Sequence, residues 1–184
     1  MALARKPEPA ALRGVELTRM RRRHLRRVLA IEGRVYPRPW SASLFLSELG
    51  QRSTRTYLVA RYEGVVIGYA GMMLTGREAH ITNIAVDPDF QGLKVGTRLL
   101  IALLTEGVAR GAGVISLEVR VSNQSAQAMY TKFGFSITGV RKGYYIETNE
   151  DAYVMVVEDA ASTEFRKRLL AIRAEIDELT GDGP

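Results

Sequence analysis

Residues 84–100 combine a buried strand, a short loop with glycines and the beginning of an apolar helix. The loop carries Gln91, Gly92 and Gly96, and the helix that follows is rich in leucine. A loop of this kind offers a row of free backbone N–H groups, and the N-terminus of a helix adds about half a positive charge. The segment therefore predicts a binding site for a pyrophosphate.

Two familiar phosphate loops do not match this segment. A Walker A loop needs Gly-Lys-Ser or Gly-Lys-Thr at a fixed spacing, and a Rossmann fold needs a complete glycine triplet; neither is present here. The glycine spacing alone leaves the phosphate carrier open. Its identity has to come from the rest of the chain.

Composition narrows the class of protein. With 184 residues, 46% of them hydrophobic and 25% charged, the chain matches one ordinary globular domain. The absence of cysteine excludes disulfides, thiolate zinc sites and cysteine nucleophiles, and we expect no metal. The first dozen residues lack the apolar core of a signal peptide, and no apolar run approaches the roughly 20 residues that span a membrane. We expect a cytoplasmic protein with no membrane contact.

Hydrophobic periodicity predicts a mixed α/β fold. A first strand at 15–17 ends at Thr18, a candidate N-cap for a helix over residues 20–35. Glu63-Gly64 is a candidate hairpin turn. Further helices are expected at 41–49 (capped by Ser41), 95–110 and 125–133 (capped by Ser125), and further strands at 56–62, 65–74, 80–86, 114–120, 135–141 and 153–157. A meander followed by βαβα units implies a mixed, mostly antiparallel sheet flanked by helices.

The two ends of the chain are expected to differ from the domain at 14–160. Residues 1–13 predict a disordered arm, and residues 161–184 predict an amphipathic helix and a tail. The apolar residues of this extra C-terminal helix fall on one stripe: Phe165, Leu169, Ile172, Ile176 and Leu179. The stripe fits either a helix packed on its own domain or a contact with a partner. A monomer and a weak homodimer both remain open.

Part of the net charge of +6 is concentrated between Arg21 and Arg27, where five arginines surround His24. They form either a solvated helix face or a surface that attracts a polyanion, such as nucleic acid or a ribonucleoprotein. No aromatic-interleaved RNA-binding motif accompanies them.

Glu118 is predicted to lie on a strand of alternating polarity, on the same face as Ser116 and Arg120. A carboxylate in mid-strand near the centre of a sheet is costly unless it is paired or solvated in a cleft. Glu118 therefore either pairs with Arg120 or with a neighbouring strand, or acts as a general base whose pKa is raised by partial burial.

Tyr130 lies in the helix expected at 125–133, which presents Ala126, Met129 and Phe133 to the core. The spacing places Tyr130 next to this apolar stripe. Spacing alone therefore favours a buried structural tyrosine.

Taken together, these segments resemble the GNAT superfamily of acyl-CoA-dependent N-acetyltransferases, in which a Gln/Arg-x-x-Gly-x-Gly/Ala loop binds the pyrophosphate of coenzyme A. Residues 91–96 occupy the place of that loop. The resemblance is closer still to the RimI-like branch, the ribosomal-protein-alanine N-acetyltransferases, and runs from about residue 15 to residue 157. The segments that carry it are Pro39-Trp40-Ser41, Asn83 to Pro88, Leu117 to Arg120 with Asn123 beyond, Ala128-Met129-Tyr130, Phe133-Gly134-Phe135 and Gly143-Tyr144-Tyr145.

The resemblance implies acetyl-CoA as cosubstrate and a role for each matched residue. It implies that Glu118 is the base that takes a proton from the acceptor ammonium, directly or through water, and that Tyr130 is the acid that protonates the leaving thiolate. The residues implied to surround the incoming peptide terminus are Trp40, Tyr144 and Tyr145. The residues implied to bind acetyl-CoA are Ile84, Ala85, Val86, Gln91, Gly92, Leu93, Lys94, Val95, Gly96, Thr97 and Asn123.

Lys94 departs from the family pattern, because it stands where the loop usually has its first glycine. If this position needs a positive φ, lysine is disfavoured there. If the position is helical, lysine is harmless, and its ammonium can help to hold the phosphates. We expect at most weaker or altered binding of the cosubstrate.

The acceptor implied by the resemblance is the α-amine of a protein N-terminus, with the N-terminal alanine of a small-subunit ribosomal protein as the leading substrate. One alternative is a GNAT enzyme that acetylates a lysine or a small amine. An alternative of another class is a non-catalytic module that responds to acyl-CoA or binds a ribonucleoprotein through the segment from Arg21 to Arg27. Tyr144 and Tyr145 also fit ordinary packing at the end of a strand.

Overall fold

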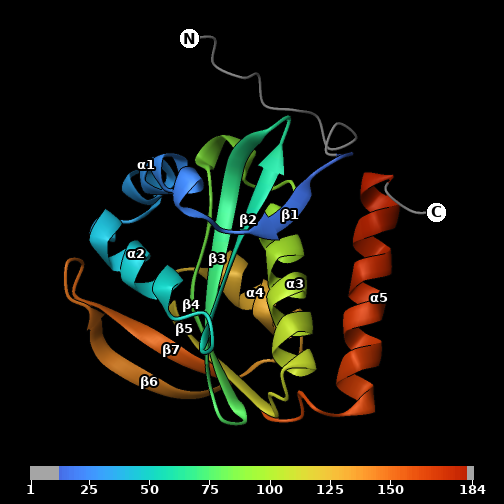
Figure 1. Cartoon of the computed structure of the whole chain (residues 1–184). Helices are drawn as coiled ribbons and strands as arrows, with labels where there is room; N and C mark the ends of the chain where they lie inside the picture. Colours follow the sequence, from blue (N-terminus) through green and yellow to red (C-terminus); the bar gives the residue numbers. More distant parts are fainter. Residues whose placement is uncertain (1–12, 182–184) are drawn as a thin grey trace.

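The computed structural model describes residues 13–181, which form a seven-stranded mixed sheet covered by helices (Figure 1). The arm predicted at 1–13 lies outside the described residues except for Arg13. The strand order is β1-β2-β3-β4-β5-β7-β6, and every described neighbouring pair is antiparallel except β4 and β5. The strands are β1 (Glu16–Arg19), β2 (Arg55–Tyr62), β3 (Val65–Thr75), β4 (Glu78–Val86), β5 (Val114–Arg120), β6 (Ser136–Tyr145) and β7 (Glu150–Val157).

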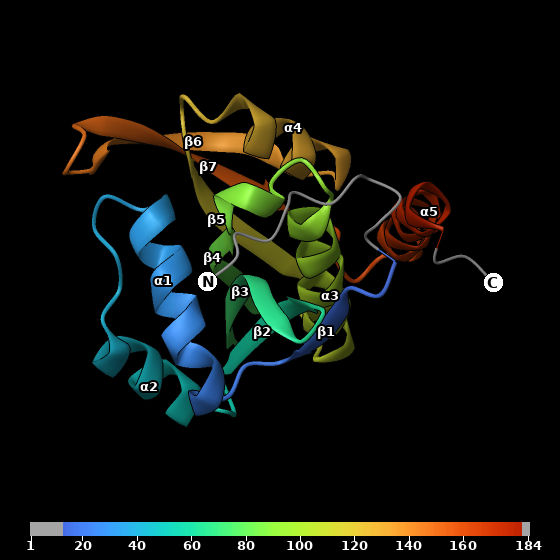
Figure 2. The same cartoon turned by 90° about the horizontal axis from the view of Figure 1, so that it is seen from above.

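The helices cover both faces of the sheet and divide the core in two (Figure 2). They are η2 (Arg22–His24), α1 (Leu25–Val35), α2 (Ala42–Gly50), η3 (Pro88–Phe90), α3 (Val95–Ala109), α4 (Gln124–Lys132) and α5 (Thr163–Thr180). The larger core joins the sheet to α3, α4 and α5, and the smaller one joins it to α1 and α2. No helix among residues 13–181 is long and apolar enough to span a bilayer. The predicted mixed α/β architecture is confirmed.

The feature that positions the site is the early end of pairing between β4 and β5. Their register covers only three residue pairs, and the last is His80 with Ser116. Beyond this pair the two parallel strands diverge, although β4 continues to Val86 and β5 to Arg120. The sheet therefore opens into a gap at its centre.

Two predicted caps are wrong. Thr18 lies within β1 opposite Val59, and the extended chain continues to Met20, whose N–H donates to the Tyr57 carbonyl, so the first helical turn begins only at Arg22. The cap of α4 is Asn123 rather than Ser125, because the Asn123 side chain accepts the Ala126 N–H. Ser41 caps α2 as predicted, with its hydroxyl accepting the Leu44 N–H.

The β6–β7 hairpin is longer than predicted at the end that carries its turn. β6 reaches Tyr145, which pairs with Glu150, instead of stopping at residue 141. Periodicity fails there because the register between the strands shifts beyond Arg141, and charged side chains replace the apolar alternation. The hairpin at Glu63-Gly64 is confirmed, with φ angles of 49° and 80° that suit a tight turn.

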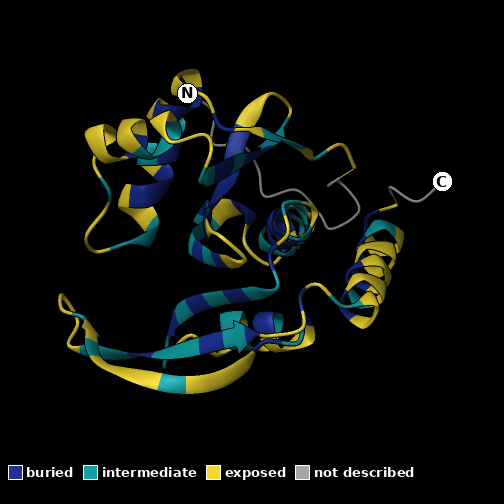
Figure 3. Ribbon diagram, turned by 60° about the horizontal axis from the view of Figure 1, so that its bottom comes forward, coloured by how far each residue is buried: buried dark blue, intermediate teal, exposed yellow. Residues whose placement is uncertain are grey.

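Helix α5 packs on its own domain. Its residues Phe165, Leu169, Ile172 and Ile176 are buried in the larger core, whereas its outer side is exposed (Figure 3). The predicted apolar stripe is wrong for Leu179, which is 59% exposed at the last turn of the helix. Lys132 on α4 also reaches Glu175 on α5 at 2.6 Å. Most of the apolar stripe of α5 is therefore buried against the described residues of its own chain.

Candidate active site

The gap between β4 and β5 opens into a cavity of about 960 Å³. Its walls come from β4 and β5, from the loop before α3, from α4, from the segment between α1 and α2, and from the end of β6. The cavity brings together all of the predicted site residues but one. Leu93 is the exception, because its side chain is buried in the core beneath the loop.

The loop before α3 presents backbone groups to one side of this cavity. Gly92 has a φ of 81°, which turns the chain toward the helix. The first intrahelical hydrogen bond is from the Arg98 N–H to the Lys94 carbonyl, and Lys94 makes no side-chain cap. The preceding N–H groups at the start of an α-helix have no intrahelical partner. Those of 95–97 therefore lie at the cavity wall in the arrangement that favours an anion.

Lys94 has φ 61° and ψ 11°, which is the left-handed region. Position 94 therefore has the positive φ that was the first of the two alternatives. Lysine here adopts a conformation that favours glycine. The Lys94 side chain is exposed and lines the cavity, so its ammonium lies beside the loop at 91–96.

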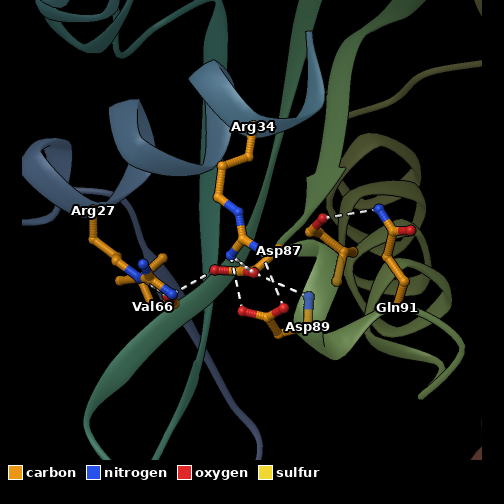
Figure 4. A network of polar contacts seen from close by, with 7 residues as sticks. Arg27, Arg34, Val66, Asp87, Asp89 and Gln91 are labelled. Carbon is orange, nitrogen blue, oxygen red and sulfur yellow. Dashed lines mark hydrogen bonds and ion pairs between the residues drawn. The ribbon is translucent and has the colours of Figure 1, made fainter. Parts of the chain in front are cut away.

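The edge of β4 that faces the gap carries the backbone groups of Ile84 and Val86. Because the Asp87 N–H donates to the Ile67 carbonyl on β3, the alternate residues Ile84 and Val86 turn their polar groups the other way. Gln91 donates its side-chain N–H to the Val86 carbonyl at 3.2 Å (Figure 4). Tyr36 donates its hydroxyl to the Ile84 carbonyl at 3.0 Å. The backbone groups of Ala85 instead point toward β3, where Ala85 lies opposite Tyr69.

A buried aspartate fixes the segment between β4 and α3 against α1. Asp87 is 0% exposed and accepts hydrogen bonds from Arg27 and from Arg34, the latter at 2.6 Å (Figure 4). It also caps η3 by accepting the Asp89 N–H at 3.1 Å, and Arg27 reaches the Val66 carbonyl. Arg27 is therefore engaged in the fold, and the exposed part of the arginine cluster is Arg21, Arg22, Arg23 and Arg26.

Glu118 projects into the other side of the cavity from β5, with its side chain 8% exposed. Its carboxylate pairs with His80 on β4 at 3.0 Å and with Arg141 on β6 at 3.2 Å. The hydrogen bond from His80 lowers the pKa of Glu118, against the opposing effect of burial, and the charges of His80 and Arg141 lower it further. The expected rise of this pKa is wrong, and the pairing partners are His80 on the neighbouring strand β4 and Arg141 on β6 instead of Arg120.

Arg120 organises the aromatic end of the cavity instead. It reaches Glu147 at 2.7 Å and Glu150 at 3.0 Å, and its guanidinium lies 3.7 Å from the centre of the Tyr145 ring. The rings of Tyr144 and Tyr145 are nearly perpendicular, with centres 5.1 Å apart. Burial raises the pKa of Tyr145 to about 12.

Tyr130 is both a buried residue and a cavity residue. Its ring packs against Phe135 at a centre-to-centre distance of 5.9 Å, and burial raises the pKa of its phenol, with Tyr145 adding a smaller effect. The phenol therefore holds its proton more firmly than an exposed tyrosine does. Asn123 also lines the cavity, while its side chain caps α4.

Sequence reasoning missed further cavity residues, among them Glu32, Tyr36 and His80. Glu32 is 1% exposed, and burial raises its pKa to about 7 although Tyr69 and the Trp40 backbone oppose the change. The available signal was a glutamate on the apolar face of a helix, next to Ile31 and one turn from Val28. Tyr36 and His80 gave no local signal, because their partners lie far away in the sequence.

A family model described as the acetyltransferase (GNAT) family matches residues 25–135. Because this is more than half of the chain and the fold agrees, the chain belongs to the GNAT family of acetyl-CoA-dependent N-acetyltransferases.

Within that family the chain is RimI-like. It is 38% identical over 129 residues to the [ribosomal protein bS18]-alanine N-acetyltransferase of Escherichia coli, covering 69% of this chain and 86% of that enzyme. It is 42% identical over 121 residues to the N-alpha-acetyltransferase RimI of Mycobacterium tuberculosis, covering 64% and 74% of the two chains. The crystal structure of the ribosomal-protein-S18-alanine N-acetyltransferase from Escherichia coli superposes with a TM-score of 0.74 at 32% identity, over 82% of this chain and 97% of that one.

Proposed function

We propose that this enzyme transfers acetyl from acetyl-CoA to the α-amine of a protein N-terminus, most specifically to the N-terminal alanine of a small-subunit ribosomal protein. The observation that carries the proposal is one cavity with two different sides. A loop rich in backbone N–H groups lies on one side, and a carboxylate among aromatic side chains lies on the other. The names of the E. coli relative and of its solved counterpart support the choice of acceptor.

The residues on the first side suit a long ligand that ends in a pyrophosphate. The backbone N–H groups of residues 92–97 would hold the phosphates, with the ammonium of Lys94 beside them. The outward-facing backbone groups of Ile84 and Val86 would pair with the pantetheine arm, and Asn123 would add a side-chain hydrogen bond. When bound, acetyl-CoA supplies an acetyl thioester.

On the second side, Glu118 would take a proton from the acceptor ammonium, directly or through a water. A free α-ammonium has a pKa of about 7.7–8.0, well above that of an ordinary glutamate, so the deprotonation is uphill and needs a positioned carboxylate. The lowered pKa of Glu118 keeps it ionised at neutral pH and ready to accept a proton.

Tyr130 would give a proton to the departing sulfur. In the overall transfer the amine nitrogen forms a bond to the acetyl carbon while the carbon–sulfur bond breaks. The ammonium loses two of its three protons: one leaves through Glu118 to solvent, and the other balances the proton that Tyr130 donates. The buried phenol of Tyr130 is protonated at neutral pH, as an acid in this step requires.

Trp40, Tyr144 and Tyr145 would surround the incoming chain terminus. They come from two different elements that line the cavity, and the contact with Arg120 fixes Tyr145 in place. This group of aromatic side chains is the structural argument for a peptide end as the acceptor.

The test is a thiol-release assay with matched acceptors. A peptide with a free N-terminal alanine should release thiol from acetyl-CoA, whereas the same peptide with a blocked N-terminus should release none. Turnover of a blocked peptide through an internal lysine, or of a small amine, would favour the alternative acetyltransferase. Salt-dependent RNA binding with no thiol release would favour a non-catalytic module.

The oligomeric state is a separate question. The molar mass of the purified chain in solution, measured at several protein concentrations, would decide between a monomer and a weak homodimer.

A further inference from the structure

His80 stands at the point where the sheet opens. It belongs to the last residue pair between β4 and β5, opposite Ser116, and it lines the cavity. Its Nδ1 lies 3.0 Å from the Ser116 hydroxyl, and its Nε2 lies 3.0 Å from a Glu118 carboxylate oxygen. A continuous chain of hydrogen bonds therefore runs from Ser116 through the imidazole to Glu118.

The chemistry of the partners fixes one proton position in this chain, at Nε2. An ionised carboxylate only accepts hydrogen bonds, so the Nε2 that faces Glu118 carries a proton. In a neutral imidazole the other nitrogen is then an acceptor, and the Ser116 hydroxyl donates to it. The neutral Nε2–H form satisfies all three groups at once.

The charged and titratable neighbours of the pair come from several elements. Arg141 on β6 holds the second carboxylate oxygen of Glu118, and the phenols of Tyr144 and Tyr145 feel the charge of Glu118. On the same face, Thr82 of β4 contacts Tyr57 of β2, whose hydroxyl bonds Glu48 of α2; Glu48 in turn pairs with Arg55. Among these groups His80 and Arg141 contact the Glu118 carboxylate directly, and of the two only the imidazole exists in both a neutral and a charged form.

We propose that His80 is a positioning residue for the base: its neutral imidazole orients the Glu118 carboxylate toward the acceptor, with Ser116 holding the imidazole in the required form. The inference rests on the proposed function, since it assumes that Glu118 accepts a proton from an ammonium. Once protonated, the imidazolium pairs more strongly with the carboxylate and competes with the ammonium for it. Activity therefore depends on the neutral form of His80.

The experiment compares two substitutions of His80 over pH 5–9, with peptide and acetyl-CoA saturating. His80→Gln keeps a side-chain N–H that can reach Glu118 but does not titrate. It should retain kcat within about threefold at pH 8, and the slope of log kcat against pH below pH 6 should fall by one. His80→Ala loses the hydrogen bond, so its kcat should fall by up to about a hundredfold at every pH, with little change in KM for acetyl-CoA.

The second histidine of the chain provides a matched control. His24 is buried outside the cavity, between Arg21 and Arg23. His24→Gln should leave the shape of the pH profile as it is in the wild type, even if the variant is less stable. A wild-type acid limb in His80→Gln, or wild-type kcat in His80→Ala, would overturn the positioning role.

The two proposals fail in different ways. If wild-type protein releases no thiol with any free N-terminal peptide, the proposed acceptor is wrong. Nitrogen-15 NMR of the same protein still reads the tautomer of His80 at pH 8, without any acyl acceptor. The Nε2–H form is expected, and the Nδ1–H form would overturn the hydrogen-bond chain.

Discussion

The guanidinium of Arg120 lies 3.7 Å from the centre of the Tyr145 ring and joins the end of β5 to the end of β6. Glu118 lies two residues before Arg120 on β5, and Tyr144 lies directly before Tyr145 on β6; both line the cavity. The contact therefore links the strand that carries Glu118 to the pair of Tyr144 and Tyr145. Substitutions in and around this group of residues should separate chemistry from stability.

Glu118→Gln should lower kcat by about 10²–10⁴-fold, the usual contribution of a general base, and should lower stability by about 1–3 kcal/mol without unfolding the protein, because it loses charge-assisted hydrogen bonds to His80 and Arg141. The glutamine has almost the same shape, so the loss would be chemical. Stopped assays of thiol release measure the effect. Glu175→Gln on exposed α5 is the control and should retain normal turnover.

Tyr130→Phe should lower kcat by about 10²-fold or more, because the thiolate would lose its proton donor. The ring and its packing on Phe135 remain, so circular dichroism should match the wild type. Tyr153→Phe removes a phenol from the same core without touching the cavity, and it should be silent. Near-normal turnover in both Tyr130→Phe and Glu118→Gln would refute the assigned mechanism.

Lys94→Gly should stabilise the protein by roughly 0.5–1 kcal/mol. A left-handed conformation costs a non-glycine residue about 1–2 kcal/mol, and the entropy of the unfolded glycine takes back about 0.5–1 kcal/mol. Glu63→Gly, at a φ of 49° in the β2–β3 turn, should show the same gain in urea unfolding. Acetyl-CoA affinity distinguishes the two: a change only in Lys94→Gly marks a role in binding, and no change argues against one.

Asp87→Asn should destabilise the fold by about 2–3 kcal/mol, since it removes charge-assisted hydrogen bonds to Arg27 and Arg34. The arginines are partly exposed and can turn to water, which keeps the cost below that of a fully buried pair. Asp89→Asn, on an exposed pair, should cost less than about 1 kcal/mol. Equal costs for the two variants, measured by urea unfolding, would contradict the structural role of Asp87.

Glu32 should make the free energy of unfolding depend on pH. Its pKa is raised from 4.5 to about 7 in the folded protein, so between these values the folded state holds a proton that the unfolded state has lost. The contribution of Glu32 to stability is therefore full below about pH 4.5 and declines toward pH 7, by roughly 3 kcal/mol. Glu32→Gln should abolish this decline in urea titrations at pH 5 and pH 8. A parallel decline in the variant would assign it to another group.

Much of the architecture follows from local patterns. The hairpin at Glu63-Gly64, the strand at 114–120 and the capped helix after Ser41 each carry their own turn, alternation or cap, and each is confirmed. Thr18 shows the limit of this reasoning. A threonine before a helical pattern fits a cap, but pairing with β2 extends the strand past it.

The site depends on contacts that no window of sequence contains. The pKa of Glu118 is lowered because His80 and Arg141 arrive from two other strands, and neither spacing nor composition brings them together. The motifs identified which residues gather at the cavity. The carbonyl contacts of Tyr36 and Gln91, and the direction of the Glu118 shift, required the folded chain.

The short register between β4 and β5 gives this protein an edge strand in its interior. Edge strands on a surface attract other chains, and proteins usually blunt them with charges or bulges. Here helices on both faces enclose the unpaired rim, and two side chains bond its carbonyls. The unpaired edge thereby faces the cavity instead of the protein surface. An extended ligand of the right length would pair with its backbone groups, as an added strand does in peptide recognition by sheet extension. Selectivity would then come from the side chains around the cavity, because backbone groups alone pair with any extended chain.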